Sequence, residues 1–365
     1  MRGSSTAVAA PDAWGQPQAA QESATPLSLT ESVPSPLITG IFGSGRSGST
    51  WLGAIIDSHP SVAYRFEALH RLAAIDPSVR ALRRRLSDDT FDDDVLEQLY
   101  GALLPARPDV DKPPFFTKHY ATRAQFGQAA IWPLARRYPA LAKSFTWLYT
   151  PRGRPMLVFK EVTSERIMRN LLARTAMRAI YLIRHPAAVV HSILQGQGRG
   201  LMPTGRREAL SSLVQELDPH LPERMGIELN RLLPIEIEAL FWRIDAELGM
   251  VAALSSSRAH IVVYESLCDQ PERVVQDVFA HLNLDFPEST HRFLTASDRG
   301  SLFERVRRGE FGTNPYFSVF RKPSEVRDRW QHELDADDVR RIMRMVEDSY
   351  AFQRAYPSLG AGFRR

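Results

Sequence analysis

The chain has 365 residues, enough for one large domain or two small ones with a sizeable core. Apolar residues make up 44% and charged residues 24%, which excludes a disordered or fibrous protein for most of its length. The 46 Lys and Arg against 42 Asp and Glu give a net charge of +4, which suits an anionic small ligand and is too weak for a nucleic-acid coat. The single cysteine, Cys268, excludes an intrachain disulfide and a cysteine-based zinc site and favours a reducing compartment.

The two ends of the chain differ in texture from its middle. Residues 1–36 are rich in Ala, Pro, Gln, Ser and Thr without a periodic apolar pattern, so we expect a disordered leader there. This leader has no apolar core like that of a secretory signal, and no stretch of the chain approaches the roughly 20 apolar residues of a membrane helix. We therefore expect a cytoplasmic protein without integral membrane association, folded over 37–357 and followed by a tail at 358–365.

Short apolar runs predict the strands of a parallel sheet. They are nearly continuous rather than alternating, as is typical of strands covered on both faces. The predicted strands are 37–42, 156–159, 179–183 and 260–265. The predicted helices are 50–57, 166–177, 187–194, 236–254, 271–282 and 338–352. This alternation predicts an α/β fold of three layers with a central parallel sheet of about five strands.

The segment between the first strand and its helix is a candidate anion site. It reads Gly-Ser-Gly-Arg-Ser-Gly-Ser-Thr over 43–50, where backbone N–H groups and the helix N-terminus can bind a phosphate. The spacing nearly matches the P-loop pattern G-x-x-x-x-G-K-[ST], but the lysine is missing because Ser49 follows Gly48. Arg46 supplies a cation two residues earlier. A tight turn without any ligand is the less favoured interpretation.

A second candidate anion site follows the third predicted strand. That strand ends in Arg184, where a Mg²⁺-dependent phosphotransferase needs an acid, and Ser192 lies two turns into the next helix. The two side chains could hold one phosphate together, the arginine through its planar fork. Two anion sites without an evident metal ligand suit a nucleotide with phosphate at both ends of its ribose, namely 3′-phosphoadenosine 5′-phosphosulfate (PAPS). A nucleoside or shikimate-type kinase would need the missing lysine and acid.

These motifs resemble those of the PAPS-dependent sulfotransferase family, which has a P-loop NTPase-like fold. The resemblance implies that 46–50 binds the 5′-phosphosulfate, that Arg184 and Ser192 hold the 3′-phosphate, and that Tyr264 contacts the base. Arg329-Trp330, preceded by the loop 314–323, resembles the segment that closes over the nucleotide. The implied nucleotide-binding residues are Gly45, Arg46, Ser47, Gly48, Ser49, Thr50, Arg184, Ser192, Tyr264 and Arg329.

By motif the chain looks most like the tyrosylprotein and carbohydrate sulfotransferases, as a soluble, bacterial-type member. The runs at 46–50, 57–62 and 66–67 follow that branch in order and spacing. Its catalytic base falls on Glu67, and the lysine that ends its second strand falls on Lys160. Sulfuryl transfer needs a base for the acceptor proton and cations for the leaving oxygen. The predicted catalytic residues are Glu67, Arg46 and Lys160.

Other interpretations of the charged and basic residues stay open. Glu67 could instead form a salt bridge with Arg65 or Arg71. His119 or His70 could serve as the base, since cytosolic members of the family use histidine.

Further positions depart from the family or have a structural interpretation. The tyrosylprotein enzymes carry another arginine four residues beyond the serine, where this chain has Gly196, and Arg199 is the candidate replacement. His59, beside a proline, is expected to be structural, and His185 to cap its helix. Tyr264 could be an ordinary strand aromatic.

No motif identifies the acceptor, which could be the hydroxyl of a sugar, a phenol or another small molecule, of a lipid or of a peptide tyrosine. The segments 71–150 and 196–235 are the expected acceptor-side insertions, mostly helical and irregular, the second a candidate lid. The acidic run at 88–94 indicates a helix N-terminus rather than a metal site. We expect a monomer or homodimer that binds no nucleic acid. The alternative function is an inert nucleotide-binding protein of the same fold.

Overall fold

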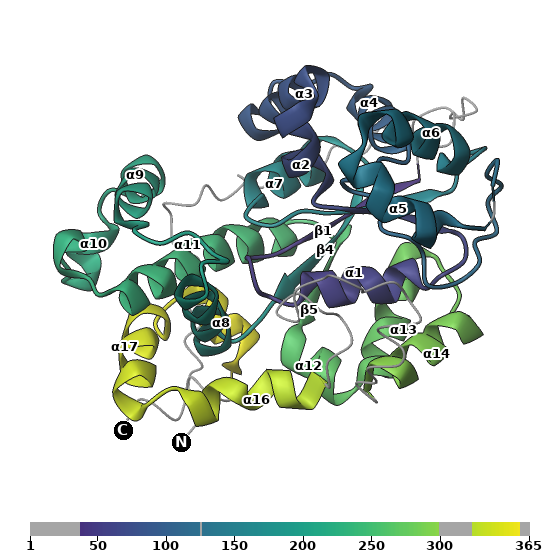
Figure 1. Ribbon diagram of the computed structural model, residues 1–365. Coiled ribbons are helices and arrows are strands. Elements are labelled where there is room, and N and C mark those ends of the chain that lie inside the picture. Colours follow the sequence, from purple (N-terminus) through teal and green to yellow (C-terminus); the bar gives the residue numbers. More distant parts are fainter. Residues whose placement is uncertain (1–36, 125, 299–322, 358–365) are drawn as a thin grey trace, which may run out of the picture.

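The computed structural model describes residues 37–124, 126–298 and 323–357 (Figure 1). The strands are β1 (Ile38–Phe42), β2 (Val62–Phe66), β3 (Met156–Lys160), β4 (Arg178–Ile183) and β5 (Ala259–Val263). They form one five-stranded sheet in the order β2-β3-β1-β4-β5, and every neighbouring pair is parallel. The predicted α/β fold with about five parallel strands is thus confirmed. The predicted leader at 1–36, the tail at 358–365 and the closing loop up to residue 322 lie outside the described residues.

Helices connect and cover these strands, and each range predicted to be helical from the sequence coincides with an observed helix, the last of them with two. In chain order they are α1 (Ser49–Asp57), α2 (Ala68–Ile75), α3 (Pro77–Asp88), α4 (Val95–Leu103), α5 (Gln128–Arg137), α6 (Pro139–Tyr149), α7 (Glu165–Arg174), α8 (Pro186–Gly198), α9 (Arg207–Leu217), α10 (Leu221–Met225), the 3-10 helix η2 (Leu229–Arg231), α11 (Pro234–Leu254), α12 (Tyr264–Asp269), α13 (Pro271–Leu282), α14 (Glu288–Asp298), α16 (Pro323–Glu333), α17 (Ala336–Val346) and α18 (Tyr350–Ala355).

The sheet lies between two hydrophobic cores, because successive residues of a strand point to opposite faces. In β3, Leu157 and Phe159 join one core, while Met156 and Val158 join the other. The first core holds α2, α3, α4, α7, α8, α11 and α17, and the second holds α1, α13 and α14. Figure 1 shows α7 and α11 on one side of the strands and α1 and α13 on the other. Burial on both faces explains why the strands read as continuous apolar runs.

The edge strand β2 was missed by the sequence patterns because a charged residue interrupts its apolar run. Arg65 is only 1% exposed in the middle of the strand. Its guanidinium donates to the carbonyls of Leu103 (2.8 Å) and Leu104 (2.7 Å) at the end of α4, and lies 3.4 Å from Asp111. Its donors are therefore satisfied by the two carbonyls and its charge is balanced by Asp111, all about 40 residues away, which no local pattern reveals.

Two predicted elements differ in extent from those observed. The strand expected to run to residue 265 ends at Val263, and Tyr264 begins α12. The turn there is held by Glu265, whose carboxylate accepts the His185 amide (3.0 Å) and the Tyr356 hydroxyl (2.9 Å). The single helix expected over 338–352 is two helices, because Ser349 caps a new one by accepting the Phe352 amide.

The acidic run at 88–94 only partly matches its interpretation as a helix start. Asp88 ends α3, Asp89 follows in a left-handed conformation (φ 57°), and Asp94 precedes α4. Among the described residues no group of three or more His, Cys, Asp or Glu is placed to hold a metal ion. In the same part of the chain, no helix has the length and apolar character required to cross a membrane.

Candidate functional site

The predicted site residues converge on the edge of the sheet where its parallel strands end. The phosphate loop follows β1, Glu67 follows β2, Lys160 ends β3, Arg184 follows β4 and Tyr264 follows β5. Ligands of open α/β sheets bind at this edge, beside a central strand from which the chain turns to either side. Here β1 is that strand, flanked by β3 and β4.

The loop between β1 and α1 has the backbone of an anion-binding turn. Arg46 (φ 70°) and Gly48 (φ 99°) have left-handed backbones. Gly48 is the residue before α1 and has no side chain to accept hydrogen bonds from the first amides of the helix, which can therefore donate to an anion. A Cβ at Gly48 would lie 2.4 Å from the ring of Tyr264, whereas one at Gly45 would meet no atom within 4 Å. The loop is thus closely packed against the start of α12 at Gly48 and open at Gly45.

Four arginines line a cavity of about 60 Å³ beside this loop, and we call it the arginine pocket. They are Arg46, Arg184, Arg199 and Arg329, from the loop, the end of β4, the end of α8 and α16. Ser192 lines the cavity too. The predicted 3′-phosphate residues Arg184 and Ser192 thus meet there with Arg329 of the predicted closing segment. Arg46 and Arg199, the candidate replacement for the family arginine missing at Gly196, line the same cavity. Among the described residues that line the cavity none is acidic, and Glu333 of α16 pairs with Arg329 at 3.7 Å.

Arg184 is held in the pocket with one donor left over. Its Nη1 donates to the Arg46 carbonyl (3.2 Å), its Nη2 to the Val326 carbonyl (2.8 Å), and its guanidinium lies over the Tyr264 ring at 4.4 Å. The buried Nε has no hydrogen-bond partner within the described part of the chain. Such a donor is costly unless an acceptor completes it.

Arg46 was predicted to act at the sulfate end, and its side chain lies with the arginine pocket. Its Nε donates to Ser192 Oγ at 3.0 Å, across 146 positions of sequence. Ser192 therefore contacts Arg46, and it lines the same cavity as Arg184. That Arg184 and Ser192 hold one phosphate together stays a prediction. Phosphate loop and α8 are joined by this contact.

Glu67 and Lys160 form the second group at the sheet edge. Lys160 Nζ donates to Glu67 Oε1 at 2.8 Å, and Arg71 Nε donates to the other oxygen at 3.2 Å. The interpretation of Glu67 as a partner of Arg71 is thus confirmed alongside its pairing with Lys160, whereas Arg65 is paired elsewhere. Glu67 itself has a left-handed backbone (φ 48°) at the turn into α2.

The charges of this pair follow from burial and from mutual attraction. Burial by itself raises the pKa of the Glu67 carboxyl, but Lys160 and Arg71 outweigh it, so the pKa lies below its usual value. Burial lowers the pKa of the Lys160 ammonium, against the attraction of Glu67. The neighbouring Glu161 differs, because burial raises its pKa to about 7. Glu67 is thus ionised at neutral pH beside a carboxyl that titrates there.

The histidines weighed as bases or structural groups occupy distinct places. His59 contacts Asp285 Oδ1 (3.1 Å) through Nε2, and its Nδ1 accepts the Ser61 amide, so it is structural. His185 accepts the Ala187 amide through Nδ1 and caps α8, as predicted. His70 lies exposed on α2. For His119 the structure shows a backbone hydrogen bond to Pro60.

Trp51 is a site residue that the sequence patterns did not single out. It lies in the first turns of α1, 7% exposed, with its ring centroid 6.1 Å from that of Tyr264. Its indole Nε1 is buried without a partner among the described residues. The only available signal was its place directly after the phosphate loop.

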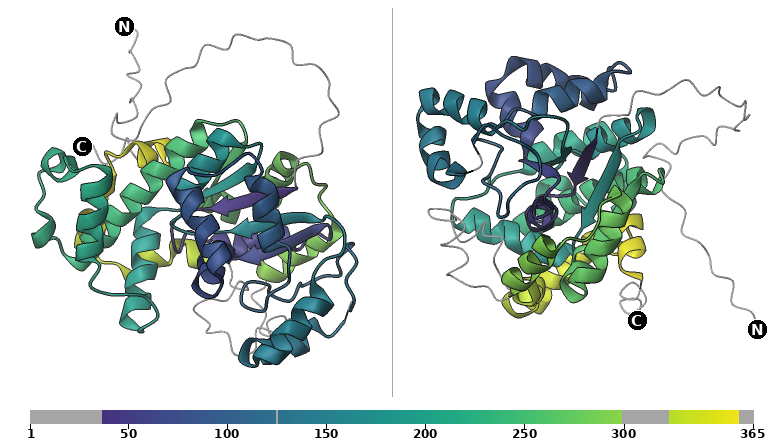
Figure 2. Two further views of the ribbon diagram at one scale, coloured as in Figure 1. Left: turned by 90° about the horizontal axis from the view of Figure 1, so that it is seen from above. Right: turned by 90° about the vertical axis from the view of Figure 1, so that its right-hand side faces the viewer.

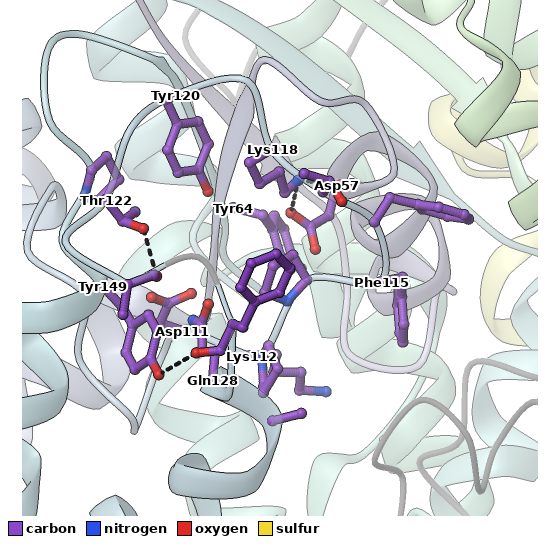
Figure 3. Close-up of a pocket in the computed structure, with 18 of the residues that line it drawn as sticks. Asp57, Tyr64, Asp111, Lys112, Phe115, Lys118, Tyr120, Thr122, Gln128 and Tyr149 are labelled. Carbon is purple, nitrogen blue, oxygen red and sulfur yellow. Dashed lines mark hydrogen bonds and ion pairs between the residues drawn. The ribbon is translucent and has the colours of Figure 1, made fainter.

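A further cavity of about 300 Å³ borders the Glu67 side of the site (Figure 3). It is lined by β2 and by the segment 111–129, within the predicted acceptor-side insertion. The Phe66 ring connects this cavity to the Lys160–Glu67 pair. The Nζ atom of Lys112, which lines the cavity, lies 4.4 Å from the ring centroid, and the Nζ atom of Lys160 lies 4.5 Å from it. The Tyr64 hydroxyl, on a residue of its wall, is buried without a described partner.

Comparison with known proteins supplies a family. The family model described as "Sulfotransferase family" matches residues 39–288. A search of curated proteins found no match.

Solved structures with a similar fold are distant. The sulfotransferase domain of the Synechococcus PCC 7002 olefin synthase is 17% identical, with 84% of this chain and 92% of that chain covered and a TM-score of 0.41. The mouse sulfotransferase SULT7A1 complexed with PAP is 12% identical, with 87% of this chain and 88% of that chain covered and a TM-score of 0.42. Sulfotransferase STF9 from Mycobacterium avium is 14% identical, with 91% of this chain and 78% of that chain covered and a TM-score of 0.37. These likenesses are too remote to assign substrates or residues.

Proposed function

Because this chain belongs to the sulfotransferase family, we propose that it transfers the sulfuryl group of PAPS to an acceptor hydroxyl, with Glu67 as the base. The nucleotide would lie along the phosphate loop, with its 3′-phosphate in the arginine pocket and its base beside Tyr264 and Trp51. When bound, PAPS supplies a sulfuryl group whose bond to the phosphate oxygen breaks as the acceptor oxygen attacks sulfur.

The observation that carries this proposal is a set of buried donors without acceptors around the loop. They are Ser47 Oγ, Trp51 Nε1 and Arg184 Nε, all without a hydrogen-bond partner in the described ranges. Buried polar groups are normally satisfied, and each exception needs a reason. A polyanionic ligand with a flat base supplies acceptors for hydroxyl, indole and guanidinium donors alike, which supports PAPS over a neutral ligand.

The Lys160–Glu67 pair suits the base and charge-stabilising roles. Glu67 is ionised at neutral pH and can accept the acceptor's proton on the oxygen that Lys160 or Arg71 releases. Lys160, only 2% exposed, positions that carboxylate, and a cation in so dry a place stabilises negative charge strongly. Glu67 has backbone strain from its left-handed turn, which is common at functional positions.

Turnover is the direct test. The protein is incubated with PAPS and a panel of sugar, phenol and aliphatic alcohol acceptors, and sulfated product and desulfated nucleotide are measured by mass spectrometry. We expect equal amounts of both with at least one acceptor. Tight nucleotide binding with no product from any acceptor, and no slow hydrolysis of PAPS, would favour the inert nucleotide-binding protein. EDTA should leave activity unchanged.

A further inference from the structure

The helices α5 and α6 form a hairpin, residues 126–149, which lies at the edge of the molecule in both views of Figure 2. The helices are joined at Tyr138 and pack on each other through a small core of their own. That core contains Ala106, Ala135, Phe145 and Tyr149 and is separate from the two cores on the sheet. The hairpin is therefore an appendage that stabilises itself and contributes little to the sheet.

The outer surface of the hairpin is apolar where water would favour polar residues. Phe126 is 83% exposed, Trp147 59%, and Leu134 and Tyr138 51% each. Trp147 lies two residues after the buried Phe145, so on a helix of 3.6 residues per turn it faces away from the small core. Large exposed aromatic and aliphatic side chains gathered on one hairpin are typical of contact surfaces in soluble proteins.

The same region has an unusual charge pattern. Residues 112–160 contain nine Lys and Arg and no Asp or Glu, while the rest of the chain has 37 Lys and Arg against 42 Asp and Glu. On the hairpin Arg136, Arg137 and Lys143 are exposed, and Arg123 lies over the Trp147 ring at 4.5 Å. The hairpin is thus a positively charged patch on an otherwise net-negative chain.

We propose that the outer surface of the α5–α6 hairpin docks on anionic lipid bilayers. Exposed Trp and Tyr prefer the boundary between headgroups and hydrocarbon, and neighbouring Lys and Arg are attracted by anionic headgroups. Both features are present here, and the charge of the patch is complementary to such a surface. The proposed association is peripheral and reversible.

Docking would bring the cavity of Figure 3 to the lipid surface. Phe126, Gly127, Gln128 and Ala129 of the hairpin region line that cavity, and Phe126 is also on the exposed surface. An amphiphilic acceptor held in the bilayer is therefore the substrate class that we infer. This last step rests on the proposed sulfotransferase function, whereas lipid binding does not.

Vesicle sedimentation of the full chain tests the proposal without PAPS. Vesicles of phosphatidylcholine alone are compared with vesicles containing phosphatidylglycerol, at low and at physiological salt. We expect binding to the anionic vesicles, weaker at the higher salt because ions screen the attraction. Trp147→Glu and Lys143→Glu should each weaken that binding by about tenfold or more.

Matched substitutions on another face are the controls. Ile75→Glu at the end of α2 (62% exposed) and Arg84→Glu on α3 make the same chemical changes away from the hairpin and should leave vesicle binding unchanged. Absence of binding to anionic vesicles at low salt would overturn the proposal, as would equal losses in the controls. So would a dimer in sedimentation velocity that Trp147→Glu dissociates while no variant affects vesicles, because the patch would then join two copies of the chain.

Discussion

The arginine pocket and the Lys160–Glu67 pair stand at the same edge of the sheet, yet they hold charge in opposite ways. The pocket gathers four guanidinium groups, and none of the described residues that line it is acidic. The pair balances a buried ammonium against a carboxylate at 2.8 Å. Guanidinium groups brought close together repel one another unless an anion binds between them, whereas the two charges of an ion pair compensate each other. This difference is the reason why we propose nucleotide binding for the pocket and proton transfer for the pair.

The largest expected effect comes from removing the proton acceptor of the pair. Glu67→Gln keeps the shape of the side chain, and turnover should fall at least about a hundredfold because general base catalysis contributes about 10²–10⁴ in rate. Nucleotide affinity should barely change. The measurement is single-turnover product formation together with calorimetric titration of the nucleotide. Retention of more than about a tenth of the rate would remove Glu67 from this role and direct attention to His119 or His70.

The complementary experiment removes a cation from the pocket. Arg184→Ala should weaken PAPS binding about tenfold or more, since a charge-assisted hydrogen bond contributes about 1.5–3 kcal/mol. Calorimetry measures the affinity of both proteins for PAPS and for an analogue that lacks the 3′-phosphate. The wild type should bind PAPS more tightly than the analogue, whereas the variant should bind the two equally. Arg340→Ala on α17 is an exposed control. Equal affinity of the wild type for both nucleotides would contradict a 3′-phosphate role for the pocket.

Arg46 is the residue that can connect the two regions. If it binds the sulfate end as predicted, Arg46→Ala should lower both nucleotide affinity and rate. If its contact with Ser192 (3.0 Å) is kept in the complex, affinity alone should fall. Calorimetry and single-turnover rates on one variant separate these outcomes.

A smaller effect is expected from the loop that supports the pocket. Gly48→Ala places a Cβ 2.4 Å from Tyr264 at φ 99°, so the free energy of unfolding should fall by about 1–3 kcal/mol. Gly45→Ala has open space at its Cβ and should cost less than half as much. Denaturant melts of both proteins measure the difference. Equal losses would mean that the Tyr264 ring moves aside freely.

The smallest effect is a pH dependence beside the pair. Burial raises the pKa of Glu161 to about 7, so its contribution to stability is complete below the pKa of an unfolded glutamate and is lost as pH rises through about 7. The wild type should lose on the order of 1 kcal/mol more than Glu161→Gln between pH 5 and 8. Denaturant unfolding of both proteins at pH 5 and at pH 8 measures this difference. An equal change in the free energy of unfolding of the two proteins would refute the raised pKa of Glu161.

The elements at the sheet edge show what local patterns can and cannot predict. The loop at 43–50 was predictable because its glycines, hydroxyls and arginine are consecutive, and β1, β3 and β4 because both of their faces are apolar. The strand β2 was not predicted because the buried Arg65 depends on distant partners, the Leu103 and Leu104 carbonyls and the Asp111 carboxylate. Residue roles at the site stay predictions until variants are measured.

By itself the sequence determined the fold class, the phosphate loop and the family, since each depends on residue types at short spacing. Only the tertiary structure decided which side chains meet. Glu67 and Lys160, 93 positions apart, are joined because β2 pairs with β3, with Phe66 opposite Lys160. Arg46 reaches Ser192 across 146 positions because β4 lies beside β1. Strand order is settled by burial of both faces of the whole sheet, and no single segment contains that information.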